Sequence, residues 1–246
     1  MAGILFIISA PSGSGKSTLV ARLRETVTNL EFSISYTTRD KRGSERDGIE
    51  YNFISREEFE QMICEDAFLE HAEVFGNYYG TAFHFLTDAE QDGKDLLLDI
   101  DVQGAAQLRA KIPDAVSIFI LPPDKQTLEI RLRRRSQAEH VVDEPIILRR
   151  LEKARDEIGS YVEYDYILVN DKLDDAVDEL EAVVWSERLD RHSPDSLGLT
   201  SEEAERYRKL ANRCRLGKNS RVAPVLESFG IANTGDGSHG DGQQVS

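Results

Sequence analysis

Residues 4–18 read Ile-Leu-Phe-Ile-Ile-Ser-Ala-Pro-Ser-Gly-Ser-Gly-Lys-Ser-Thr, and this stretch decides the fold. Its first five residues are a continuous apolar run, which is typical of a strand buried on both faces of a sheet. A loop rich in glycine and serine follows, and a helical pattern runs from Ser17 to about Val27. A strand, a glycine-rich loop and a helix in this order predict a phosphate-binding loop.

The loop has the spacing of a P-loop except at Ala10, which stands where the first glycine is usual. Gly13 and Gly15 allow backbone conformations that point N–H groups inward, where the oxygens of a triphosphate replace water. We expect Lys16 to reach the β- and γ-phosphates and the hydroxyl of Ser17 to ligate Mg²⁺. The expected phosphate-binding residues are Ala10, Pro11, Ser12, Gly13, Ser14, Gly15, Lys16, Ser17 and Thr18.

The rest of the chain alternates apolar runs with helical patterns. The apolar runs are 96–100, 117–121 and 166–169. The helical patterns are 82–92, 102–111, 146 to about 161, and 172–191. This alternation predicts an α/β fold of the P-loop NTPase type, with a parallel sheet covered by helices on both faces. Right-handed crossovers then bring the C-terminal ends of the strands, and with them the site, to one edge.

Two aspartates mark the end of the run at 96–100. If this strand neighbours the phosphate loop, Asp99 can hold Mg²⁺ or its water shell. Asp101 is two residues further on and shares a face with Asp99 while the strand lasts. The alternative is a pair of solvated turn aspartates, which the P-loop in the same chain disfavours.

The composition limits the class of protein. The chain has 246 residues, of which 40% are hydrophobic and 30% charged, enough apolar material to exclude wholesale disorder. A net charge of −15 disfavours a duplex-binding protein, which usually carries a basic face. The apolar run at 4–8 is far shorter than the roughly 20 residues of a membrane span or the apolar stretch of a signal peptide. Because Cys64 and Cys214 have no metal-ligand spacing, we expect two reduced thiols in a cytoplasmic protein without a membrane partner.

Two segments interrupt the alternation. Residues 32–81 are rich in arginine, tyrosine, glutamate and glycine, and residues 124–157 carry the densest arginine cluster, Arg131-Leu-Arg-Arg-Arg135. We interpret both as mobile flaps over the edge of the sheet where the phosphate loop lies.

A series of short motifs resembles guanylate kinases. The motifs are Pro11-Ser-Gly-Ser-Gly-Lys-Ser-Thr18, Ser35-Tyr-Thr-Thr-Arg39 with Arg42, Gly48-Ile-Glu-Tyr51, Phe68-Leu-Glu-His-Ala72, Gly76-Asn-Tyr-Tyr-Gly80, Asp99-Ile-Asp-Val-Gln-Gly104 and Val169-Asn-Asp171. They occur in family order from about residue 4 to about residue 188. Several of them are not shared with other nucleoside monophosphate kinases, so the resemblance is specific.

The resemblance implies a three-part fold and a reaction. Residues 1–31, 82–123 and 158–192 would form a core that binds ATP, residues 32–81 an insertion that binds GMP, and residues 124–157 a helical lid. The implied reaction transfers a phosphoryl group from ATP to GMP with Mg²⁺, giving ADP and GDP in purine nucleotide metabolism. The deoxynucleotide dGMP is expected as a second acceptor.

The resemblance also implies the GMP site. By motif position, the residues that read guanine are Ser35, Glu70 and Asp101, with Thr81 near the base. The residues that clamp the GMP phosphate are Arg39, Arg42, Tyr51 and Tyr79. The chemistry agrees, because the Glu70 carboxylate can accept both the N1–H and N2–H₂ donors of guanine, a pair that adenine lacks. Arg39 and Arg42, three residues apart, can fork onto one phosphate. The alternative is an ordinary surface pair of arginines and core packing for the tyrosines.

Three arginines resemble the lid arginines of the family and are expected to act in catalysis together with Lys16. They are Arg131, Arg135 and Arg150, with Arg149 as a rival for the third position. Phosphoryl transfer needs such charges because negative charge spreads over the oxygens of the transferred group.

The chain departs from the family pattern near these arginines. Arg135-Ser-Gln-Ala138 stands where Arg-Gly-x-Asp is usual, and the stretch that follows is longer and contains Pro145. The sequence therefore leaves the fold of residues 136–148 open. Lys41 stands where proline is usual and adds a cation beside the phosphate clamp.

Residues 193–246 extend beyond the resemblance. Residues 201–215 have a helical pattern, and the glycine-rich residues 235–246 are expected to be disordered. One face of the helix carries Ala204, Tyr207, Leu210, Ala211 and Cys214. We expect this helix to pack on the core or on a second copy in a homo-oligomer. Residues 206–221 hold seven bases and no acids, which leaves an RNA- or anion-binding appendage as an alternative. Because no motif ties the extension to the chemistry, a chain ending at His192 is expected to fold and keep its turnover.

Two other functions compete with an active guanylate kinase. A catalytically silent interaction module of the same fold would lack a working phosphate loop, whereas Lys16, Ser17 and Asp99 are all present. A kinase for another monophosphate is disfavoured by Glu70 and Asp101.

Overall fold

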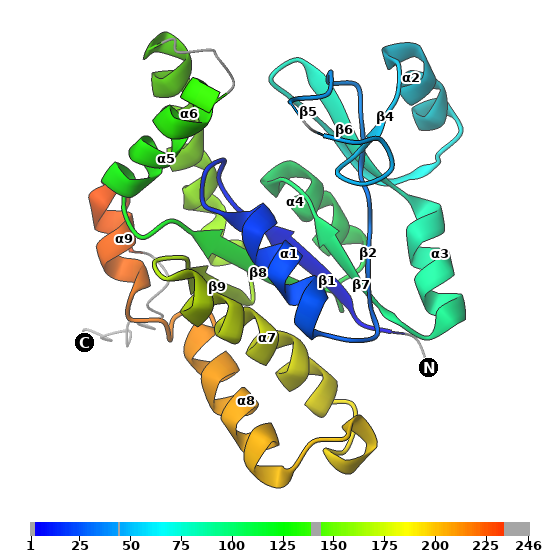
Figure 1. The fold of residues 1–246 in the computed structure, drawn as a ribbon, viewed down its shortest axis with the longest axis vertical. Helices are drawn as coiled ribbons and strands as arrows, with labels where there is room; N and C mark the ends of the chain where they lie inside the picture. Colours follow the sequence, from blue (N-terminus) through cyan, green and yellow to red (C-terminus); the bar gives the residue numbers. More distant parts are fainter. Residues whose placement is uncertain (1–2, 44, 139–143, 234–246) are drawn as a thin grey trace, which may run out of the picture.

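The computed structural model describes residues 3–43, 45–138 and 144–233. Its centre is a sheet of five parallel strands in the order β2–β7–β1–β8–β9 (Figure 1). The strands are β1 Leu5–Ser9, β2 Leu30–Phe32, β7 Asp95–Asp99, β8 Val116–Leu121 and β9 Tyr166–Val169. All residues of β1, β8 and β9 are buried, as expected for strands that helices cover on both faces. The predicted parallel α/β sheet is confirmed.

Helices pack on both faces of this sheet (Figure 1). One face is covered by α1 Lys16–Thr26, α7 Leu173–Leu189 and α8 Ser201–Cys214. The other is covered by α3 Phe83–Asp92, α4 Val102–Lys111, α6 Glu144–Gly159 and α9 Val222–Ser228. Side chains alternate along β1, so Phe6 and Ile8 join the first core, and Leu5 and Ile7 join the second. Burial of each such side chain stabilises the fold by about 1.5–3 kcal/mol.

A second, four-stranded sheet in the order β4–β3–β6–β5 carries the other wall of the site (Figure 1). Its strands are β3 Tyr36–Thr37, β4 Asn52–Phe53, β5 Phe68–Val74 and β6 Asn77–Ala82, and α2 Arg56–Cys64 packs against it. Ser55 caps the N-terminus of this helix, and the side chains of Ser55 and Glu58 each accept from the other's backbone N–H. Phe59, Phe68 and Ala82 form a small core between helix and sheet.

Helices α5 Lys125–Ala138 and α6 form a pair beside the phosphate loop. Arg133 of α5 joins them, because its guanidinium donates to the carboxylate of Glu144 over 2.6 Å. Part of the stretch left open by the sequence is now defined. Pro145 lies in the first turn of α6, where proline is tolerated. Residues 139–143 lie outside the described residues.

The extension packs on the core through two helices. The predicted face of α8 lies against α7, with Ala204, Ala211 and Cys214 buried. The chain then returns to the central sheet, where the backbone N–H of Leu216 donates to Asp165 and the side chain of Asn219 donates to the Ile167 carbonyl. Beyond it, α9 contributes further apolar side chains to the second core. This packing argues against the expectation that a chain ending at His192 folds.

Three other expectations concern disorder, membrane spans and the cysteines. The expected disorder of residues 235–246 lies outside the described residues. No helix within the described part of the chain is long and apolar enough to span a bilayer. Both cysteines are free thiols: Cys64 is exposed and Cys214 is buried.

Candidate active site

A cleft of about 960 Å³ opens at the C-terminal ends of the central strands. Its walls come from the phosphate loop, the ends of β7 and β9, the four-stranded sheet, and helices α5 and α6. The strands of a parallel sheet all end at the same edge, so side chains far apart in the sequence meet here. Most of the residues predicted for the site line this cleft.

The phosphate loop has the backbone geometry that its glycines allow. Gly13 and Gly15 have φ angles of 92° and 90°, in the left-handed region that L-residues with a side chain avoid. A Cβ on Gly15 would overlap the side chain of Asn170, whose Nδ2 donates to the Ser14 carbonyl over 2.7 Å. Helix α1 begins at Lys16, so its positive N-terminus faces the loop. The loop therefore offers an anion-binding cradle. Of its predicted residues only Ser14 does not line the cleft.

Lys16 and Asp99 form an ion pair on the floor of the cleft. Strand β7 neighbours β1, with Asp99 opposite Ile8, so the condition set for a role of Asp99 beside the phosphate loop is met. The ammonium group of Lys16 also donates to the Ile100 carbonyl over 3.0 Å. The Lys16 side chain is only 17% exposed.

The same floor offers ligands for one small cation. Ser17 and Asp99 both line the cleft and present a hydroxyl and a carboxylate. The described residues contain no cluster of three or more metal-binding side chains. Mg²⁺ usually takes one or two carboxylates and completes its shell with water and substrate phosphates. The residues present fit that ion.

The predicted phosphate clamp is assembled around Arg39. Its guanidinium carbon lies 5.4 Å from the centroid of the Tyr51 ring. The rings of Tyr51 and Tyr79 meet edge to face, with 5.8 Å between their centroids. The fourth predicted member, Arg42, lines the same part of the cleft. Glu45, which sequence reasoning missed, accepts from Arg39 Nη2 over 3.0 and 2.9 Å and from the Arg42 backbone N–H over 2.8 Å. A carboxylate thus lies between the guanidinium of Arg39 and the backbone N–H of Arg42.

Most of the residues predicted to contact guanine are more deeply buried than the phosphate clamp. Glu70 is 3% exposed, and its carboxylate accepts from the Thr81 hydroxyl over 2.7 Å. Burial raises the pKa of Glu70 to about 7, although the hydrogen bond from Thr81 opposes the shift. Asp101 caps helix α4 by accepting from the Gly104 N–H over 2.9 Å, and it lines the cleft. Ser35, Glu70 and Thr81 are buried and do not line the main cleft.

The three arginines predicted for the lid lie on α5 and α6 and line the cleft. Arg131 donates to the carbonyls of Ser14 and Asn170, each over 3.2 Å. Arg135 and Arg150 line the cleft as well. Arg149, the rival of Arg150, does not line it, so the geometry favours Arg150 as the third lid arginine.

Asn170, Lys153 and Glu157 are among the further cleft-lining residues that sequence reasoning missed. Asn170 follows β9 and lies within a motif of the resemblance, which was a usable signal. Lys153 and Glu157 are one helical turn apart on α6, with 3.6 Å between ammonium and carboxylate. Burial raises the pKa of Glu157 to about 7. No signal in the sequence separated these two from an ordinary surface pair.

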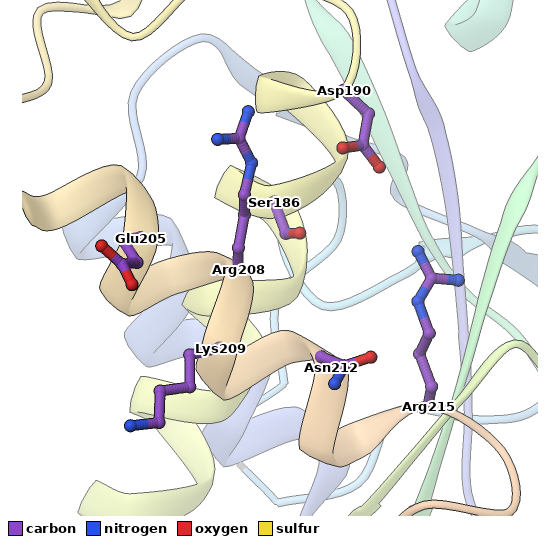
Figure 2. A pocket seen from close by; sticks show the side chains of 7 residues that line it. All are labelled: Ser186, Asp190, Glu205, Arg208, Lys209, Asn212 and Arg215. Atoms are coloured by element: carbon purple, nitrogen blue, oxygen red, sulfur yellow. The ribbon is translucent and has the colours of Figure 1, made fainter. Parts of the chain in front are cut away.

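The basic stretch in the extension is largely committed to contacts within the chain. Arg208 donates to the Leu189 carbonyl, Arg215 lies 3.6 Å from Glu187, and Arg221 is paired with Glu179. A groove of about 450 Å³ runs between α7 and α8, and Figure 2 shows that acidic Asp190 and Glu205 line it together with the cations. Such mixed charge and internal pairing are unlike the basic stripe of a nucleic-acid-binding protein.

Comparisons with known proteins agree on one family. A family model described as guanylate kinase matches residues 3–187. The guanylate kinase of Koribacter versatilis (strain Ellin345) is 56% identical over 230 residues, which cover 93% of this chain and 97% of that protein. The guanylate kinase of Escherichia coli (strain K12) is 48% identical over 189 residues, covering 76% and 89%. The crystal structure of guanylate kinase from Anaplasma phagocytophilum matches with a TM-score of 0.63 at 34% identity, covering 76% and 86%.

The alignments differ in how far they extend. The Koribacter alignment covers 93% of the chain, so it continues well beyond residue 187, where the family model ends. The Escherichia coli alignment covers 76% of the chain. The extension is therefore shared with one of these relatives rather than added to this chain alone.

Proposed function

The chain belongs to the guanylate kinase family, and on that premise we propose how its cleft transfers a phosphoryl group from ATP to GMP. Membership of the family makes it an ATP:GMP phosphotransferase, and nothing favours a catalytically silent module. One observation supports the assignment of residues most strongly. The phosphate loop with its lysine lines one side of a cleft whose other side carries Arg39, Tyr51 and Tyr79. The buried carboxylate of Glu70 lies on the same four-stranded sheet as Tyr79.

In the proposed GMP site, Glu70 accepts the N1–H and N2–H₂ donors of guanine, while Ser35, Thr81 and Asp101 contact the rest of the base edge. The Thr81 hydroxyl donates to Oε1 of Glu70, and Oε2 lies beside Gly104 at the start of α4. Adenine would leave this buried carboxylate without donors, and such a mismatch can give discrimination of about 10⁴–10⁵.

We assign the GMP phosphate to the site that Glu45 occupies between Arg39 and Arg42. A dianionic phosphate carries more charge than a carboxylate and adds a third oxygen, so it competes well for the Arg39 guanidinium and the Arg42 N–H. Tyr51 and Tyr79 would add neutral hydroxyl donors. Displacement of the Glu45 side chain would then accompany GMP binding.

The proposed ATP site is the loop from Ala10 to Thr18. Its N–H groups and the N-terminus of α1 would bind the phosphates, and Lys16 would turn from Asp99 toward the β- and γ-phosphates. Ser17 and Asp99 would hold Mg²⁺, whose charge neutralises the oxygens of the transferred group when it is bound.

In the transfer step, an oxygen of the GMP phosphate attacks the γ-phosphorus of ATP. The new P–O bond forms as the bond to the leaving oxygen of ADP breaks, and a dianionic GMP phosphate needs no proton acceptor. Arg131, Arg135 and Arg150 would face the charge that spreads over the equatorial oxygens. Their helices would exclude water, which otherwise accepts the phosphoryl group.

This assignment divides the chain into parts. We propose that residues 1–31, 82–123 and 158–192 bind ATP, that residues 32–81 bind GMP, and that residues 124–157 act as a lid. Two free thiols and the absence of a membrane-spanning helix among the described residues support a cytoplasmic location.

Product analysis tests the proposal. The purified protein is mixed with ATP, GMP and Mg²⁺, and the nucleotides are followed by ³¹P NMR. We expect ADP and GDP in equal amounts, no inorganic phosphate, and no reaction when Mg²⁺ is chelated. Release of inorganic phosphate without GDP would show an ATPase instead and would overturn the proposal.

A further inference from the structure

The turn between β5 and β6 holds a bulky side chain in a conformation that it rarely adopts. Phe75 has a φ of 52° and Gly76 a φ of 82°, which makes a two-residue hairpin turn in the left-handed region. Asparagine or glycine would adopt this conformation more readily than phenylalanine. The ring is nonetheless 48% exposed, so burial in a core does not account for it.

The ring of Phe75 lies against the lid. In Figure 1 the tip of the β5–β6 hairpin is directed toward α6. The ammonium nitrogen of Lys153 lies 4.4 Å from the ring centroid, and the guanidinium carbon of Arg149 lies 5.6 Å from it. Both distances are within the range of cation–π attraction. The four-stranded sheet and the lid therefore touch through one aromatic ring and two cations.

Lys153 continues this contact into the cleft. Its ammonium lies 3.6 Å from the carboxylate of Glu157, and both side chains line the cleft together with Phe75. The charges of Asp101 and Lys16 act on Glu157 in turn. The ammonium group of Lys153 thus lies between Phe75 at the hairpin tip and the carboxylate of Glu157 in the cleft.

We propose that Phe75 is a positioning residue for the lid: its ring holds Lys153 and Arg149 so that the lid closes over ATP when the GMP-binding sheet is occupied. This inference rests on the proposed function, because it presumes that the two sheets bind different nucleotides. Phe75 is assigned no contact with the reacting atoms. It acts by joining the two walls of the cleft, which explains why a strained aromatic residue is kept at an exposed turn.

Point variants of the full chain separate the ring from the backbone. Phe75→Asn removes the ring and suits a positive φ, so it leaves the turn without strain. Phe75→Tyr keeps the aromatic ring. Lys153→Met removes the cation and keeps a similar side-chain length, whereas Lys153→Arg keeps a cation. Phe83→Ala is the matched control, because Phe83 is 47% exposed but does not line the cleft.

The readouts are chosen so that a merely structural role would not move them. We expect Phe75→Asn to leave the binary Kd for GMP within twofold of wild type. Its kcat for GMP phosphorylation should fall by about 5–20-fold, a factor of about 2–5 for each lost cation–π contact. The binding of a non-hydrolysable ATP analogue should no longer tighten when GMP is added. Phe75→Tyr, Lys153→Arg and Phe83→Ala should behave like wild type.

A double variant tests the contact between Phe75 and Lys153. Phe75→Asn with Lys153→Met should lower kcat by less than the product of the two single effects, because both remove the same contact. An unchanged kcat and unchanged coupling in Phe75→Asn, in an enzyme whose wild type makes GDP, would overturn this inference alone. A wild type that makes no GDP would instead overturn the proposed function.

Discussion

Gly104 and Glu70 are packed so closely that a Cβ on residue 104 would overlap Oε2 of the Glu70 carboxylate. Gly104 lies in the first turn of α4, and Glu70 lies on β5 of the other sheet. The absence of a side chain at residue 104 therefore lets the four-stranded sheet place its buried carboxylate against the N-terminus of a core helix. That N-terminus carries partial positive charge, which favours the ionised carboxylate.

We predict that Gly104→Ala displaces Glu70 and weakens GMP binding. Alanine suits a helix, so the change acts through the overlap with Oε2 rather than through helix propensity. Titration calorimetry should show a Kd for GMP at least tenfold higher and an unchanged Kd for an ATP analogue. Gly159→Ala is the control, because nothing lies within 4 Å of a Cβ at that position. Equal effects of the two substitutions would contradict this account.

The ionisation of Glu70 predicts a pH dependence. Burial raises its pKa to about 7 in the ligand-free protein, so the protonated acid prevails below that pH and the carboxylate above it. Guanine needs the carboxylate as an acceptor, so kcat/KM for GMP should fall as the pH drops from about 8 to about 6. Glu70→Gln keeps the titration of Glu157 and of the GMP phosphate. The ratio of the wild-type kcat/KM to that of Glu70→Gln should therefore decrease as the pH drops from about 8 to about 6. Parallel profiles for the two proteins would rule out a role for Glu70 ionisation.

The raised pKa of Glu70 also predicts how the free energy of unfolding depends on pH. In the folded, ligand-free protein the carboxylate form of Glu70 is disfavoured, so its ionisation reduces the free energy of unfolding as the pH rises from about 4.5 toward about 7. Glu70→Gln removes this penalty. Its Tm relative to wild type should be higher at about pH 8 than at about pH 5, as measured by differential scanning calorimetry. A difference that does not change with pH would contradict the raised pKa.

Lys16→Met tests the phosphate loop. The substitution keeps length and apolar contacts but removes the charge that pairs with Asp99 and is assigned to the β- and γ-phosphates. Loss of one such transition-state contact corresponds to about 3–4 kcal/mol, so kcat should fall by about 10²–10³ or more. Far-ultraviolet circular dichroism at the same temperature should show a folded protein. A folded variant within tenfold of the wild-type kcat would rule out the assigned role.

Removal of the extension should destabilise the protein. A chain ending at His192 loses seven buried apolar side chains: Ala204, Ala211, Cys214, Val222, Val225, Leu226 and Phe229. The larger four each contribute about 1.5–3 kcal/mol, which together is comparable with the whole stability of a typical domain. Thermal unfolding should show a much lower Tm or an insoluble protein. A chain ending at Asn233, which keeps every described residue of the extension, is the control, and equal Tm values for both would contradict the packing.

The sequence predicted those parts of the fold that have strong local patterns. The run at 4–8 and the glycines after it defined β1 and the phosphate loop, because both depend on local residue types. Strand β2 was not predicted, since its three residues are half-buried and acquire their strand only by pairing with β7. Helix α9 was missed for a similar reason. Seven residues that include a proline show no usable period, and only burial against the second core defines them.

Within the site, the motifs predicted which residues converge but not how they pair in the absence of ligand. Arg39 was expected to meet a phosphate, and the structure shows it holding Glu45. This pairing depends on the path of the loop between Arg39 and Glu45, and the spacing of charged residues in the sequence does not predict it. The contact of Phe75 with Lys153 joins segments that are far apart in the chain, and it too requires the folded structure.

The most direct test of the account is base selectivity in wild type and in Glu70→Gln. Initial rates of ADP formation from MgATP are measured by a coupled assay with GMP and with AMP as acceptors. We predict that kcat/KM of the wild type for GMP exceeds that for AMP by about 10⁴ or more, and that Glu70→Gln lowers the ratio at least tenfold through loss of GMP use. Comparable wild-type rates with AMP and GMP, or a ratio that Glu70→Gln leaves unchanged, would contradict the claim that this buried carboxylate reads guanine.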